Sequence, residues 1–176
     1  MDYSSLVYIL VIIGLAGAVV YLFSKMKVDK PGKKERTSYI GSDPNNLSSK
    51  QLQLQAYERL TLLAGRIALP GLISRVSQPG LSVRDMQVLL SQTIRQEFDY
   101  NITQQIYVSA DAWNAIKSLK DQNVLIIHQI AGALPPEATG NDLCRVLLEF
   151  LMNDPKGTLH EVVCEVLSYE AKDLLQ

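Results

Sequence analysis

The chain has 176 residues, of which 47% are hydrophobic and 20% charged, and its formal net charge is −1. This length allows one domain with an appendage. After residue 36 the chain carries eleven basic and fifteen acidic side chains, a net charge of −4. Phosphate contacts need concentrated positive charge, so no nucleic-acid partner is expected.

The first predicted element is a transmembrane anchor within residues 1–24. Its apolar stretch, LVYILVIIGLAGAVVYLF at 6–23, contains no charged residue. As a helix it would span roughly 27 Å, close to the hydrocarbon thickness of a bilayer. A cleaved signal peptide needs a basic start and a small-residue cleavage site, and the flanking segments MDYSS and YLFSKMK provide neither. A buried core helix is usually shorter. We therefore expect an uncleaved, single-pass anchor.

The segment after the anchor is strongly basic and predicts the topology. Residues 25–36 carry six basic side chains against Asp29 and Glu35, a net charge of +4. The positive-inside rule puts such a segment in the cytoplasm, so we expect the N-terminus outside and the C-terminal domain cytoplasmic. The side chains expected to contact anionic lipid headgroups are Lys25, Lys27, Lys30, Lys33, Lys34 and Arg36.

Residues 25–47 show no hydrophobic period and are predicted to form a flexible juxtamembrane linker, with a reach of roughly 27 Å. Residues 48–176 are predicted to form an all-α cytoplasmic domain, because apolar side chains recur at helical spacing and no run alternates long enough to form a sheet. The expected architecture is a transmembrane helix, a linker and then a bundle of about five helices.

Caps and breakers delimit the predicted helices. The segment LISRV at 72–76 is expected to be a short turn between the first two, and the third helix can break near Asn123. The predicted starts, each a cap or a first helical residue, are Lys50, Ser82, Ser109, Asn141 and Thr158.

The stretch EFDYNITQQIYVSADAW at 97–113 gathers carboxylates, amides, hydroxyls and aromatics. Paired carboxylates catalyse proton transfer when burial or mutual repulsion shifts one pKa, but Glu97 and Asp99 would point in different directions on a helix. His128 and His160 lie far away in sequence. The chain contains no HExxH, paired CxxC, phosphate-binding glycine loop or GxSxG motif. No catalytic, metal-binding or cofactor-binding residue is predicted, and an enzyme is the third choice of function.

Two interpretations of this stretch stay open. If the preceding helix continues through residues 101–107, Ile102 and Ile106 extend the apolar stripe of Phe98, and the amide side chains lie on the other face. Trp113 then packs at a core corner against Ile106 and neighbouring apolar groups. Alternatively, the aromatic side chains form a rigid contact surface for a partner. The candidate interaction residues are Tyr100, Gln104, Gln105, Tyr107 and Trp113.

Two segments, LQAYERLTLLAGRIALPGL and TIRQEFDYNITQQIYVSADAW, resemble a family of uncharacterised, single-pass bacterial membrane proteins. Its members carry an ERL…RI.P segment before a TIR.E…N..QQIYVS..AW block. The likeness covers roughly residues 54–117, and the second block is the specific part. The resemblance implies a short N-terminal anchor in the inner membrane with a helical cytoplasmic body, and it adds no activity.

The sequence therefore favours a non-enzymatic, membrane-tethered helical module on the cytoplasmic face, which contacts membrane lipid and binds an unknown protein partner or itself. The second hypothesis is a small accessory subunit of a larger envelope complex assembled through its anchor helix. Gly14 and Ala18 favour that hypothesis, because small residues four apart let transmembrane helices approach closely.

Overall fold

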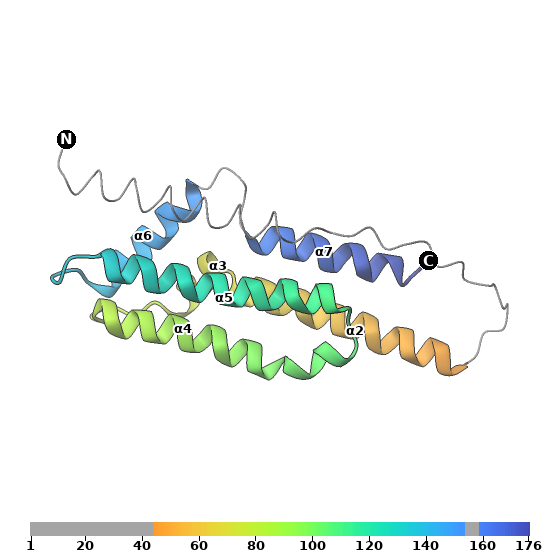
Figure 1. Ribbon diagram of the computed structural model, residues 1–176. Helices are drawn as coiled ribbons and strands as arrows, with labels where there is room; N and C mark the ends of the chain where they lie inside the picture. Colours follow the sequence, from red (N-terminus) through yellow and green to blue (C-terminus); the bar gives the residue numbers. More distant parts are fainter. Residues whose placement is uncertain (1–43, 154–158) are drawn as a thin grey trace. The chain divides into compact units, whose positions relative to one another are not determined.

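A computed structural model of the chain describes residues 44–153 and 159–176 (Figure 1). The predicted anchor and the basic segment 25–36 lie outside these residues, so both stay predictions. Within the described residues, none of the helices combines the length and the apolar character that a membrane crossing requires.

The prediction of an all-α domain is confirmed, with six α-helices and one 3-10 helix in the described part of the chain. The first helix begins at Pro44, earlier than the predicted Lys50, and the predicted turn at 72–76 belongs to a helix. In chain order the elements are α2 (Pro44–Ile67), α3 (Leu69–Val76), α4 (Val83–Tyr100), η1 (Ile102–Ile106), α5 (Ala110–Ala133), α6 (Gly140–Met152) and α7 (Leu159–Asp173).

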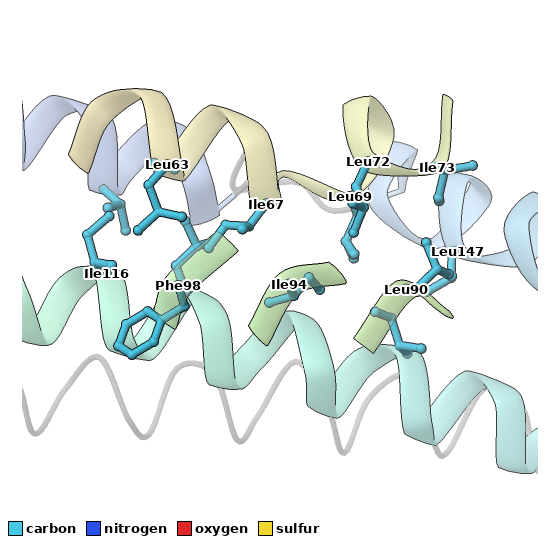
Figure 2. Packing of buried hydrophobic residues seen from close by; sticks show 14 of the residues in the cluster. Leu63, Ile67, Leu69, Leu72, Ile73, Leu90, Ile94, Phe98, Ile116 and Leu147 are labelled. Carbon is cyan, nitrogen blue, oxygen red and sulfur yellow. The ribbon is translucent and has the colours of Figure 1, made fainter. Parts of the chain in front are cut away.

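Among the described residues, the three longest helices are α2, α4 and α5, and α4 runs antiparallel to the other two (Figure 1). Helix α7 packs against α2 and α5, while α6 packs against α4 and α5. Figure 2 shows apolar side chains from several helices meeting, including Leu63 of α2, Ile94 of α4 and Ile116 of α5, all buried. Burying one such side chain stabilises the fold by about 1.5–3 kcal/mol. The helices therefore pack with their apolar stripes facing one another.

A bend after α2 leaves two backbone carbonyls to be satisfied by side chains. Ala68 has φ −59° and ψ 124° and leaves the helix, and Pro70 lacks the N–H that would otherwise reach the carbonyl of Arg66. Arg75 Nη2 donates to that oxygen at 2.6 Å. The next carbonyl, that of Ile67, accepts from Asn123 Nδ2 at 2.8 Å. Pro70 is tolerated in the first turn of α3 because that turn needs no such donor.

Asn123 therefore does not break α5, which is continuous from Ala110 to Ala133. Its side chain is buried, and a buried amide is stable in a core only when it is hydrogen-bonded. The polar residue that suggested a break instead joins the middle of α5 to the end of α2.

The N-termini of α4 and α6 meet at a close backbone contact. Ser82 caps α4 through the Asp85 N–H, and Thr139 with Asp142 forms a capping box on α6. Hydrogen bonds from Thr139 lower the pKa of the Asp142 carboxyl. The Gly140 N–H donates to the Leu81 carbonyl at 2.8 Å, so the two capping loops are held together directly.

We expect Gly140→Ala to destabilise the domain by about 1–3 kcal/mol, because an added methyl has no room. Its carbon would lie 2.9 Å from the Leu81 carbonyl oxygen and 3.0 Å from Met86 Cβ. The matched control is Gly65→Ala in α2, where nothing lies within 4 Å of the added carbon, and this change should stabilise by up to about 1 kcal/mol. Urea unfolding of residues 42–176 measures both. Changes of the same sign in the free energy of unfolding of the two variants would contradict the close contact at Gly140.

Candidate functional site

An open groove of about 540 Å³ lies between α2 and α4. Each wall is formed by residues at positions i, i+3, i+4 and i+7 of one helix, because those spacings put side chains on one helix face. The lining side chains are Arg59, Leu62, Leu63 and Arg66 of α2, Thr93, Gln96, Glu97 and Tyr100 of α4, and the following Asn101.

Charged side chains bridge the groove at one end. Arg66 Nε donates to Glu97 Oε2 at 2.8 Å, and Arg66 Nη2 pairs with Glu97 Oε1, which makes a two-point contact of the kind that planar guanidinium groups favour. These hydrogen bonds hold the pKa of the Glu97 carboxyl below its usual value. The pair fixes the Arg66 guanidinium across the groove, while more than half of that side chain stays exposed.

The other end of the groove combines a cation with an aromatic ring. The Arg59 guanidinium carbon lies 5.8 Å from the centre of the Tyr100 ring, within the range of a cation–π contact. The Tyr100 residue is 76% exposed and Leu62, between the two arginines, is 67% exposed. Two large apolar or aromatic groups therefore face solvent on opposite walls of one groove.

The chain does not continue α4 through residues 101–107, as one interpretation of the sequence assumed. Helix α4 ends at Tyr100, and Asn101 Nδ2 donates to the Glu97 carbonyl at 2.9 Å. This contact and the tighter 3-10 turn that follows rotate the next side chains relative to the α4 stripe. Asn101 and Gln104 are buried, whereas Ile106 is 71% exposed. The predicted continuation of the apolar stripe through residues 101–107 is therefore wrong.

Trp113 contacts the core through Phe98, one of the neighbouring apolar groups that the core-corner interpretation expects. Its ring centre lies 5.0 Å from that of Phe98, and Lys120 Nζ lies 4.7 Å from the centre of the Phe98 ring. Trp113 is only partly buried, and Ile106, the predicted neighbour, points largely to solvent. The tryptophan thus packs back on α4 at the corner.

The structure divides the five candidate interaction residues. Tyr100, Gln105 and Tyr107 are exposed, Gln104 is buried and Trp113 is partly buried. Only Tyr100 lines the groove between α2 and α4. Leu62, Arg59 and Arg66 are groove residues that were not predicted. The available signal for Leu62 is its position immediately before Leu63, which puts an apolar side chain outside the buried stripe.

A buried tyrosine joins three separate elements. Tyr57 of α2 donates from its hydroxyl to Glu170 Oε2 of α7 at 2.7 Å. The Tyr57 hydroxyl oxygen also accepts a hydrogen bond from the Ser109 N–H, at the start of α5, at 3.2 Å. Burial, then the contact with Glu170, raises the pKa of the Tyr57 hydroxyl. This hydroxyl fixes the positions of α7 and of the corner relative to α2.

The remaining reactive side chains do not gather into a site. Among the described residues, no three His, Cys, Asp or Glu side chains lie close enough together to hold a metal ion. Cys144 and Cys164 are free thiols, and burial raises the pKa of both.

Residues 44–153 and 159–176 thus form an all-α domain with an exposed groove between two helices. The chain belongs to a family of unknown function, DUF7935, whose model matches residues 1–174. This match extends far beyond residues 54–117, on which the resemblance in sequence depends. No curated protein and no solved structure matches the chain.

Trp113→Ala is expected to destabilise the fragment of residues 42–176 by about 2–3 kcal/mol, less than the roughly 3–5 kcal/mol typical of a fully buried aromatic residue. The loss of its contact with Phe98 is the cause. Tyr100→Ala, at an exposed aromatic near the same corner, should change stability by less than about 1 kcal/mol. Thermal unfolding of both variants measures this, and equal losses would contradict the difference in packing.

The raised pKa of the Tyr57 hydroxyl makes its contribution to stability depend on pH. A group whose pKa is raised on folding adds stability below its unfolded pKa, 10.0 for tyrosine, and that stability is lost as the pH rises through the folded pKa. We expect the wild type to be more stable than Tyr57→Phe by about 1–3 kcal/mol at pH 8. The difference should shrink above about pH 10. Urea unfolding across pH 8–11 measures it, and a constant difference would exclude this role for the hydroxyl.

Proposed function

We propose that the chain is a non-enzymatic, membrane-tethered interaction module whose helical domain binds a protein partner at the cytoplasmic face of the membrane. The groove between α2 and α4 is the binding site. The observation that carries this proposal is the exposure of Leu62 and Tyr100 on facing walls of that groove, next to Arg59 and Arg66.

Exposed apolar side chains on one face indicate a contact surface. Single exposed leucines are ordinary, but Leu62 and Tyr100 line the same groove, and the exposed Ile106 lies on η1, which packs against α2. Grouped apolar exposure with a polar rim is typical of protein-binding surfaces. Tyrosine and arginine are also the residue types that contribute most strongly to such interfaces.

The shape of the groove favours a helical partner. Two antiparallel helices form its walls, and a third helix can lie between them with apolar side chains directed inward, which is a common mode of peptide recognition. Leu62 and Tyr100 would supply the apolar contact. Arg66, held in place by Glu97, would face the partner as a preorganised cation.

The tether supports the cellular part of the proposal. The uncharged stretch 6–23 would form the anchor, and the basic residues of 25–36 would lie at anionic headgroups. The linker would hold the domain within about 27 Å of the bilayer. A partner that is itself at the membrane would meet the groove at a raised effective concentration.

Leu62→Ser should abolish capture of the partner, because it removes the apolar contact at the centre of the groove. The matched control is Leu125→Ser on α5, since Leu125 is 46% exposed and does not line the groove. The measurement is affinity capture from solubilised membranes and cytosol, using the wild type and both variants at matched melting temperature. We expect the binding loss to exceed about 2 kcal/mol for the groove variant alone. Equal capture by both variants would contradict the groove as the binding site.

A further inference from the structure

We propose that the partner in the groove is a second copy of this chain, which inserts the outer face of its α7 between α2 and α4. The inference depends on the proposed function, and it specifies the occupant of the same groove. Three features of the described residues support it: the division of charge, the exposed stripe of α7 and the matching spacing of the two surfaces.

The described domain is divided into a basic part and an acidic part. Residues 44–100, which contain both walls of the groove, carry six basic and four acidic side chains, a net charge of +2. Residues 110–153 and 159–173, which contain α7, carry four basic and nine acidic side chains, a net charge of −5. Opposite potentials of this kind steer two copies toward contact between unlike parts.

Helix α7 presents an exposed stripe on the side away from the core. Val163 and Leu167 are buried and face α2 and α5, so this helix cannot turn its outer side toward the groove of its own chain. The outer stripe has helical spacing, and Tyr169 is 76% exposed within it. Its members are Glu161, Glu165, Tyr169 and Lys172.

The stripe and the groove match in register. Arg59 and Arg66 are seven residues apart, as are Glu165 and Lys172, and seven helical residues rise about 10.5 Å. With Glu165 opposite Arg59, Tyr169 comes opposite Leu62. Lys172 then comes to the level of the Arg66–Glu97 ion pair. The acidic Glu165 thus meets the basic Arg59, Tyr169 meets Leu62, and Lys172 meets a pair with no net charge.

Such a contact joins two different surfaces, so a pair of copies still has a free α7 stripe on one copy and a free groove on the other. Contacts of this type continue from copy to copy and form either closed rings or open chains. Copies tethered to the same membrane in the same orientation are suited to this arrangement, because each presents both surfaces at the same height above the bilayer.

The test uses the full-length chain with two different affinity tags, coexpressed in one membrane. Isolation through one tag should recover the other wild-type copy. Arg59→Glu in both copies should lower the recovery by about tenfold, since like charges then face each other. Glu165→Arg in both copies should do the same. Glu137→Arg, at an exposed loop position outside both surfaces, should leave the recovery unchanged.

Complementation is the decisive arm. A copy with Arg59→Glu and a copy with Glu165→Arg should recover each other at close to the wild-type level, because the charges across their contact are again opposite. One chain carrying both changes should also associate with itself. Recovery that is insensitive to every charge reversal, as expected if the anchor helices associate, would overturn the proposal, and so would failure of the mixed pair to recover.

The result separates this inference from the proposed function. If the wild-type copies do not recover each other, the second copy is excluded as the occupant. The proposed function is then tested by capture of a different protein. It is supported if Leu62→Ser abolishes that capture and Leu125→Ser does not, and it is contradicted if both variants capture the protein equally.

Discussion

The hydroxyl of Tyr57 is a polar group placed where α2, α7 and the start of α5 meet, and the arrangement of these three elements depends on it. Burying a hydroxyl without a partner costs roughly 1–3 kcal/mol, so the surrounding chain must supply a donor and an acceptor. Ser109 supplies its N–H and Glu170 its carboxylate. Both the last helix and the corner next to the groove are thereby fixed relative to α2.

Buried polar groups also need hydrogen-bond partners at the ends of the long helices. Arg75 and Asn123 satisfy carbonyls released at the bend after α2, and Asn101 satisfies one at the end of α4. Because the turn at Asn101 and η1 changes the helical phase, buried amides alternate with exposed apolar groups at the corner. The groove is therefore built by polar contacts at helix ends as well as by apolar burial.

Sequence periodicity was sufficient to predict the all-α class and most helices, since stripes such as that of Met86, Leu90 and Ile94 depend only on local spacing. It could not predict the phase change after Tyr100, which depends on a side-chain contact to the backbone, or the continuity of α5, because the partner of Asn123 lies on another helix. The groove depends on the packing of α2 against α4, which local spacing does not determine. The sequence therefore does not indicate that Leu62 and Arg66 lie near Glu97. The anchor, the orientation and the partner stay predictions.

The amide hydrogen exchange rate of Ser109, measured by NMR on residues 42–176, tests the central role of Tyr57 most directly. Ser109 is an exposed cap residue, so an open loop would exchange it at close to its intrinsic rate. If the Tyr57 hydroxyl holds this N–H, exchange should be slowed by a large factor and should require opening of the domain. Tyr57→Phe should restore fast exchange at Ser109, while amides in the middle of α5 stay protected. Fast exchange of Ser109 in the wild-type domain would contradict the account.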